Sequence, residues 1–279
     1  MAKNKELKEV SENSEVLEGF PLLDPNSDLV KNIQEAREAG FDAGIETGDI
    51  KTYTFSKTGK FVGKDDLGNE VALENLEGII LNVNYTSELW PDEWSSTGQK
   101  RRPYIVANDL KSGPSGTVTG LAYRVGDDPG TLNIEQIAAA EVDGQSGVYH
   151  YERLPGTEFG SADNGGGKRA KEGYTITFLP RDSELPVRLK TSAGSIKYIK
   201  KFLGDLFRKV GVPTKALIRW EAAQASGGYQ HTICRGVFVQ KLTDEQHDQC
   251  KALFGNVAIP APAVAVAIEH KEVPEEAPF

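Results

Sequence analysis

Short apolar and β-branched runs alternate with polar, turn-forming segments over most of the chain. The clearest run is Leu76–Tyr85, with the sequence LEGIILNVNY. Its composition is typical of a β-strand, and glycine, proline, aspartate and asparagine residues lie in the gaps between such runs. Six shorter runs predict further strands: Tyr104–Ala107, Val118–Val125, Tyr174–Leu179, Val187–Leu189, Ala216–Ala222 and Thr232–Gln240.

The segment from Ser195 to Val210 has a helical period instead. Its apolar residues recur so that they share one face of a helix; they are Ile196, Ile199, Leu203, Leu206 and Val210. Ser195 is the expected N-cap, because a serine hydroxyl can accept a hydrogen bond from a free N–H of the first turn. Gly211 is expected to end the helix, since glycine is the common residue just past a helix C-terminus.

Two further segments predict helices, and together the elements predict a fold class. Thr243–Phe254 begins with a capping-box pattern of Thr243 and Gln246, and Leu29–Ala39 follows Asp28 as a possible N-cap. Many short strands with few helices are typical of a mainly β, α+β protein. We expect an OB-like antiparallel β barrel with helical elaborations and disordered termini.

The composition changes along the chain and divides it into three zones. Residues 1–27 are polar with little periodicity, and we expect them to be partly disordered. Residues 28–254 are expected to form the folded domain. Residues 255–279 begin with a stretch of proline, alanine and valine, which suits a semi-extended linker, and continue into an acidic tail.

Cysteine content and hydropathy restrict the class of protein. The chain has 279 residues and two cysteines, too few for a disulfide scaffold or a four-cysteine zinc site. No apolar run approaches the roughly 20 residues of a membrane helix, and the first residues lack the apolar core of a secretory signal. We therefore expect a cytoplasmic protein, in the host cytoplasm if phage-encoded, with no metal or other cofactor.

Charge is distributed unevenly. The formal net charge is −9, yet the stretch from Lys168 to Arg219 contains thirteen basic and four acidic residues, a local net charge of +9. A basic core with acidic flanks is the distribution expected of a polyanion-binding protein. The alternative is that the basic stretch is an ordinary solvated face.

A second basic cluster lies among aromatic residues. The segment SELWPDEWSSTGQKRR is polar on both sides of its two tryptophans, which favours a loop position where an indole ring can stack on a base. The alternative for each aromatic ring is packing in the core. This part of the chain contributes six candidate DNA-binding residues: Trp90, Trp94, Lys100, Arg101, Arg102 and Tyr104.

The glycine-rich stretch FGSADNGGGKRAK, residues 159–171, is a candidate for contact with a nucleic-acid backbone. It is not a Walker A loop, because Ala162 and Arg169 occupy positions where that motif needs glycine and serine or threonine. The alternative is a mobile surface loop. Its basic residues and those of the neighbouring helix are further candidate DNA contacts: Lys168, Arg169, Lys171, Lys197 and Lys201.

The order of these segments carries a resemblance. LEGIILNV, the tryptophan segment, FGSADNGGGKRAK and the helix SIKYIKKFL together resemble a group of phage-encoded proteins found among replication and recombination genes. The resemblance implies cysteine pairs flanking the glycine-rich stretch, as in a zinc knuckle. Ala170 stands where such a cysteine is expected, so no metal site follows for this chain.

The end of the sequence carries a second resemblance. Its last residues are Glu275, Glu276, Ala277, Pro278 and Phe279. This acidic stretch closing on Pro-Phe resembles the C-terminal tip of bacterial and phage single-stranded-DNA-binding proteins. The resemblance implies that Glu275, Glu276, Pro278 and Phe279 contact replication and recombination proteins.

The sequence thus predicts a non-enzymatic protein that binds single-stranded DNA without sequence preference. No HExxH, GxSxG or CxxC motif occurs. Two alternatives stay open. One is a metal-dependent nuclease or recombination factor, with acid pairs such as Asp65-Asp66 and Asp127-Asp128 as ligands. The other is a structural or interaction protein of a phage.

Overall fold

The computed structural model describes residues 50–65, 67–90, 103–113, 117–126, 134–162, 165, 167–181, 183, 185–225 and 231–254, together with Lys31. Within these ranges, thirteen strands belong to one mixed sheet. The strands are β1 (Thr52–Phe55), β2 (Phe61–Lys64), β3 (Glu70–Leu73), β4 (Asn75–Leu89), β5 (Ile105–Ser112), β6 (Val118–Thr119), β7 (Leu121–Arg124), β8 (Glu141–Val142), β9 (Gln145–His150), β10 (Lys171–Pro180), β11 (Val187–Lys190), β12 (Ala216–Gln224) and β13 (Thr232–Lys241). The helical segments are α2 (Ile134–Ala140), η2 (Tyr151–Arg153), η3 (Ala193–Ser195), α3 (Ile196–Val210), η4 (Pro213–Lys215) and α4 (Asp244–Phe254).

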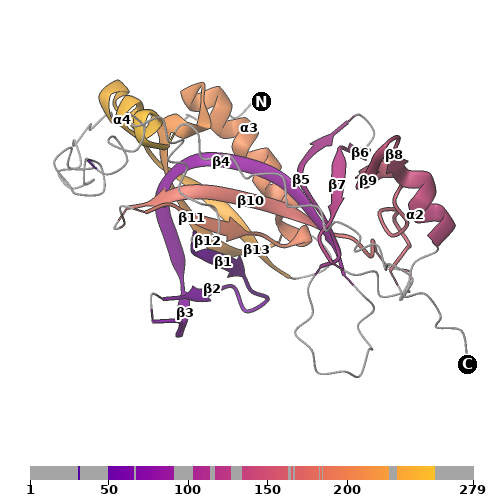
Figure 1. The fold of residues 1–279 in the computed structure, drawn as a ribbon. Coiled ribbons are helices and arrows are strands. Elements are labelled where there is room, and N and C mark those ends of the chain that lie inside the picture. The colour runs from indigo at the N-terminus through magenta and orange to yellow at the C-terminus, as the bar shows by residue number, and fades with distance from the viewer. Residues whose placement is uncertain are drawn as a thin grey trace, which may run out of the picture.

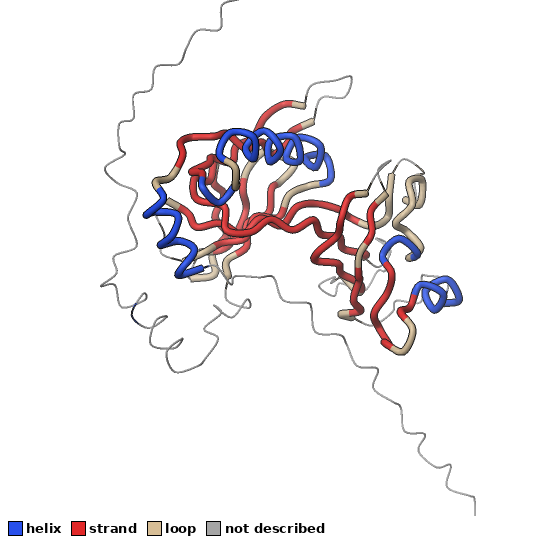
Figure 2. Tube along the Cα trace, turned by 90° about the horizontal axis from the view of Figure 1, so that it is seen from above, coloured by secondary structure: helices blue, strands red, loops and turns tan. Residues whose placement is uncertain are grey.

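The long strand β4 runs through the whole sheet. One edge of β4 pairs with β10 from Gly78 to Glu88. The other edge pairs with β12 through residues 75–79 and with β5 through residues 85–89. The sheet therefore branches at β4 and forms two lobes, which Figures 1 and 2 display. The first lobe contains β1–β3, β11–β13, α3 and α4, and the second contains β5–β9, η2 and α2.

The mainly β, α+β class is as predicted, but the antiparallel barrel is wrong. The sheet stays open between its outer strands β3 and β8, and β1 runs parallel to β11. The branching of β4 explains the difference. A closed barrel needs each strand to keep one neighbour on each edge, whereas β4 changes neighbour halfway along one edge.

Helix α3 covers the sheet of the first lobe through the predicted apolar face. Ile199 and Leu206 are buried, and the other residues of that face pack against the same core. Phe202 meets Trp220 of β12 edge-on, with ring centroids 5.6 Å apart. Gly236 of β13 allows this close approach, because a Cβ atom there would lie 2.3 Å from the Phe202 ring.

The predicted helix ends are partly confirmed. Gly211 ends α3 with a positive φ of 83°, and its N–H donates to the Phe207 carbonyl. Ser195 makes no capping hydrogen bond; it is buried, and its Oγ accepts from the Cys234 N–H of β13 at 2.9 Å. The serine therefore joins the start of the helix to the sheet, which corrects the N-cap prediction.

Helix α4 has the predicted capping box. The Gln246 N–H donates to Thr243 Oγ1 at 3.2 Å, and the Thr243 N–H donates to Gln246 Oε1 at 3.0 Å. The predicted helix Leu29–Ala39 and the zones 1–27 and 255–279 lie outside the described residues, apart from Lys31. No helix in the described part of the chain combines the length and the apolar character that crossing a bilayer requires.

Candidate functional site

A hollow of about 390 Å³ lies where the two lobes meet. It is bounded by the last residues of β1, β4 and β11 and by the first residues of β10. Four hydroxyl-bearing residues, Thr54, Thr86, Thr191 and Ser192, line it together with Phe55 and Tyr174. We call it the junction hollow.

Three lysines converge on the junction hollow from separate segments. Lys168 comes from the connection that leads from the second lobe into β10, Lys171 from β10 and Lys190 from β11. Strand register brings the last two to one face, because Lys171 pairs with Glu88 of β4 while Lys190 pairs with Thr175, four residues along β10. Two glutamates, Glu88 and Glu172, line the same hollow, which leaves a small positive balance.

Glu172, another residue of the junction hollow, is a centre of hydrogen bonds. Its carboxylate accepts from the Tyr85 hydroxyl at 2.7 Å, the Tyr151 hydroxyl at 2.8 Å and Lys168 Nζ at 2.7 Å. Its side chain is 9% exposed. Hydrogen bonds to a buried carboxylate are strong, so Glu172 joins β4, the η2 segment of the second lobe and the glycine-rich loop.

The two tyrosines in this cluster are held in their protonated form. Burial, followed by the hydrogen bond to Glu172, raises the pKa of Tyr85 above its usual value of 10. Burial also raises the pKa of Tyr151, whose hydroxyl oxygen lies 3.0 Å from Ser87 Oγ and can accept a hydrogen bond from that serine. Both phenols therefore remain hydrogen-bond donors to Glu172 at neutral pH.

Trp90 lies beside the junction hollow, at the end of β4. Its indole Nε1 donates to Glu88 Oε2 at 3.2 Å. Lys171 Nζ lies 5.4 Å from the centre of the Trp90 ring, within range of a cation–π interaction. The other carboxylate oxygen of Glu88 pairs with Lys190 Nζ at 2.7 Å.

The structure brings together part of the predicted DNA-binding set. Lys168 and Lys171 line the junction hollow, and Trp90 contacts Lys171 beside it. Arg169 points elsewhere and packs beside Gly156. Tyr104, which the sequence predicted as a DNA contact, is only 2% exposed and lies in the core. Trp94, Lys100, Arg101, Arg102 and the tail residues Glu275, Glu276, Pro278 and Phe279 lie outside the described residues.

Sequence reasoning missed Lys190, Glu88 and Glu172 as site residues. All three occupy strands, whereas the sequence predicted contacts in polar loops and on a helix. Strand alternation was the available signal, since Lys190 shares a face with Arg188 in the run VRLK. The pairing partner of that strand, which brings Lys190 to Glu88, has no signal in the sequence.

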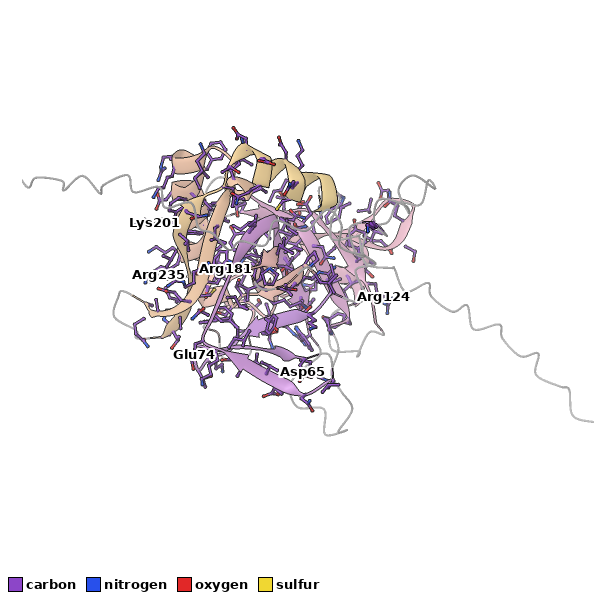
Figure 3. All side chains as sticks on the ribbon, turned by 90° about the vertical axis from the view of Figure 1, so that its left-hand side faces the viewer. Asp65, Glu74, Arg124, Arg181, Lys201 and Arg235 are labelled. Atoms are coloured by element: carbon purple, nitrogen blue, oxygen red, sulfur yellow. The ribbon has the colours of Figure 1, made fainter. Side chains whose placement is uncertain are left out.

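Lys197 and Lys201 lie on α3, which follows directly after the wall of the junction hollow. Both are exposed, together with Lys200 in the same part of the helix. The first turn contains no acidic residue, although the positive end of the helix dipole favours one there. Figure 3 displays Lys201 on the same side of the molecule as Arg235 of β13. This end of α3 is therefore a positive surface.

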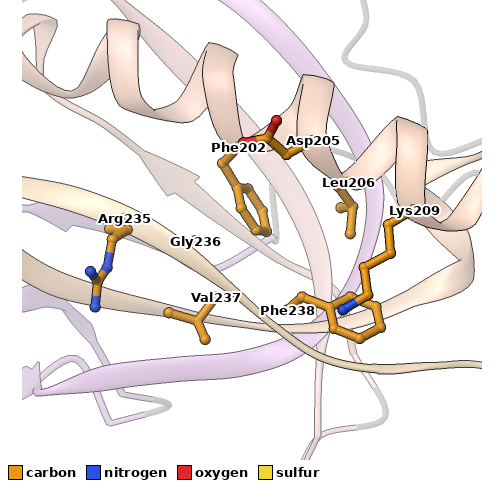
Figure 4. Close-up of a pocket in the computed structure, with 8 residues that line it drawn as sticks. All are labelled: Phe202, Asp205, Leu206, Lys209, Arg235, Gly236, Val237 and Phe238. Carbon is orange, nitrogen blue, oxygen red and sulfur yellow. The ribbon is translucent and has the colours of Figure 1, made fainter. Parts of the chain in front are cut away.

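A second hollow, of about 410 Å³, lies between α3 and β13 (Figure 4). Phe202, Leu206 and Phe238 give it an apolar lining, and Lys209 Nζ lies 3.7 Å from the centre of the Phe238 ring. Two charged residues that line this hollow form ion pairs with neighbouring side chains. Asp205 pairs with Arg208, and Arg235 pairs with Glu221.

Comparison with known proteins does not assign the chain to a family. No protein-family model matches the chain, and no curated protein or solved structure matches it significantly. Among the described residues, no group of three or more histidine, cysteine, aspartate or glutamate side chains could hold a metal ion.

Proposed function

We propose that this protein binds single-stranded DNA without sequence preference, as a non-enzymatic protein of replication and recombination. The observation that carries the proposal is the convergence of Lys168, Lys171 and Lys190 on one hollow with Trp90 beside it. Proteins that bind single strands combine cations for the phosphates with aromatic rings for the bases.

Lys190 can exchange its present partner for phosphate. It pairs with Glu88, and the two side chains are 46% and 26% exposed. An ion pair this accessible to water contributes only about 0–1 kcal/mol, so a phosphate can displace the glutamate at small cost. Lys168 is held more firmly, because its partner Glu172 is only 9% exposed.

The positive end of α3 extends this surface. The helix begins at Ile196, directly after η3, and the first residue of η3, Ala193, lines the junction hollow. Lys197 and Lys201 are exposed on its first two turns. A strand whose base stacks on Trp90 would then have phosphates facing both the hollow and α3.

The test is a fluorescence-anisotropy titration of labelled oligo-dT at several salt concentrations. The variant K168Q/K171Q/K190Q should bind more weakly at low salt. The slope of log K against log salt should become shallower by about 2, because each single-strand phosphate contact contributes about 0.7. W90A should lose about 1–3 kcal/mol of binding free energy, the usual contribution of one stacked base.

The matched control removes three exposed lysines outside the hollow, as K64Q/K111Q/K241Q. It has the same net charge as the test variant, so a general loss of positive charge affects both equally. Equal binding by the two triple variants, or no salt-dependent binding by the wild type, would rule out the proposed site. Oligo-U in the same assay tests discrimination between DNA and RNA.

The acidic tail is the second part of the proposal. Residues 269–279 contain four glutamates, including Glu275 and Glu276, and follow a proline- and alanine-rich linker. We expect Glu275, Glu276, Pro278 and Phe279 to contact partner proteins, with acidic groups steering the tail toward basic surfaces. A protein lacking the last eight residues should bind oligo-dT as well as or better than the full chain; weaker binding would assign the tail to DNA contact instead.

A further inference from the structure

Trp90 directly follows the last residue of β4 and is not itself part of a strand. The orientation of its ring therefore depends on contacts with neighbouring side chains. The indole Nε1 donates a hydrogen bond to Glu88 Oε2, and Lys171 Nζ approaches the face of the ring. Glu88 lies two residues earlier on β4, so this hydrogen bond folds the indole back toward the face that bears Glu88.

The carboxylate of Glu88 has one oxygen on Trp90 and the other on Lys190. Lys190 Nζ of β11 pairs with its Oε1 at 2.7 Å, although β10 lies between β11 and β4. Lys171 is the direct cross-strand neighbour of Glu88, and its ammonium group lies over the Trp90 ring. The glutamate thus spans three strands, and its side chain is 26% exposed.

We propose that Glu88 is a positioning residue that orients the ring of Trp90 beside the junction hollow. The proposal rests on the proposed binding of single-stranded nucleic acid. A ring already held in one orientation loses less conformational entropy when a base stacks on it. Immobilising one side chain corresponds to roughly a 2- to 10-fold change in affinity.

Two substitutions separate this role from the charge of Glu88. Both E88Q and E88L remove one negative charge, so both change the attraction of phosphates equally. Glutamine keeps a carbonyl oxygen that can accept from Trp90 Nε1, whereas leucine has no acceptor. Binding of labelled oligo-dT should therefore be roughly 2- to 10-fold weaker for E88L than for E88Q.

The background variant W90F makes the comparison specific. Phenylalanine can stack but has no N–H to donate, so E88L and E88Q should bind equally well when combined with W90F. The indole N–H resonance of Trp90, assigned by its loss in W90F, should shift in E88L more than in E88Q. Urea unfolding of each variant establishes that the proteins compared are folded.

The possible outcomes are distinct. If the wild type binds oligo-dT but E88L and E88Q bind alike, the positioning role is overturned and the proposed function stands. A difference that persists in the W90F background also overturns it, because the effect would not pass through the indole. If the wild type fails to bind at low salt, the proposed function falls, and the positioning role falls with it.

Discussion

The hydroxyl group of Ser195 illustrates how a side chain takes its role from its tertiary contacts. The local sequence favours an N-cap, yet the hydroxyl accepts from the Cys234 N–H of β13. Ser192 Oγ lies 3.1 Å away and completes a small polar cluster. Because Ser195 is fully buried, no water can replace the hydroxyl as the acceptor for Cys234.

The substitution S195A should therefore destabilise the protein by about 1–3 kcal/mol, the cost of leaving one buried donor unsatisfied. Urea denaturation measures the change in unfolding free energy. The substitution T243A is the comparison, since it removes an exposed capping bond of α4 and should cost only about 0.5–2 kcal/mol. A loss in S195A smaller than in T243A would contradict the structural role of Ser195.

At this scale the sequence predicted some site residues and missed others for a physical reason. Lys168, Lys171 and Trp90 lie at or beside the end of a strand, where polar neighbours indicate exposure. Tyr104 has the same kind of neighbours but is buried, because its backbone is hydrogen-bonded between Leu89 and Val125 in the sheet. Exposure depends on tertiary packing, which the neighbours in sequence do not specify.

At the scale of elements, β4 and α3 determine the architecture. Every apolar run predicted as a strand contains strand structure, because such runs are buried on at least one face, but Val118–Val125 divides at Gly120 into β6 and β7. The sequence did not predict β1, β2 and β3, which have four residues each, the pair β8 and β9, or the short α2. Most of these elements are too brief for a periodic signal, and β1 also depends on pairing with the distant strand β11.

Gly78 lies where β4 has neighbours on both edges. It pairs with Pro180 of β10 and Ile218 of β12. A Cβ atom there would lie 2.1 Å from the Leu179 carbonyl oxygen, a backbone atom that cannot rotate away. Glycine is therefore required for β10 and β12 to flank β4 at this point.

The substitution G78A should destabilise the fold by about 1–3 kcal/mol or more, the usual cost of overpacking. The matched control is G204A in α3, where a Cβ atom would meet nothing within 4 Å. Alanine favours a helix over glycine, so G204A should stabilise the protein by up to about 1 kcal/mol. Urea midpoints should move in opposite directions; a shift in the same direction would contradict the assigned packing.

At the scale of the whole molecule, the two lobes are joined by strand β4 and by the cluster around Glu172. Tyr151 belongs to the second lobe, and Tyr85 lies on β4. Both donate to Glu172 in their protonated form. The pKa of each phenol is raised in the folded protein, mainly by burial.

This predicts a loss of stability at high pH. Above about pH 10 the unfolded chain releases phenolic protons that the folded protein retains, so unfolding becomes more favourable as the pH rises. Each tyrosine contributes up to about 1.4 kcal/mol per pH unit. The unfolding free energy, measured in urea between pH 9 and 11, should fall with pH.

The variant Y151F separates Tyr151 from other groups that titrate in this range. Burial raises the pKa of Cys250 to about 11, and this thiol is common to both proteins. The wild type should therefore lose stability more steeply than Y151F above pH 10. Parallel curves would contradict a buried, protonated Tyr151.

The parallel pairing of β1 with β11 has a consequence for synthesis of the chain. Thr52 pairs with Arg188, so β1 cannot join the sheet until β11 has left the ribosome. At roughly 5–20 residues per second, that delay is on the order of ten seconds. During this time the β1–β3 meander has no partner strand, and the first lobe completes its folding only after most of the chain has been made.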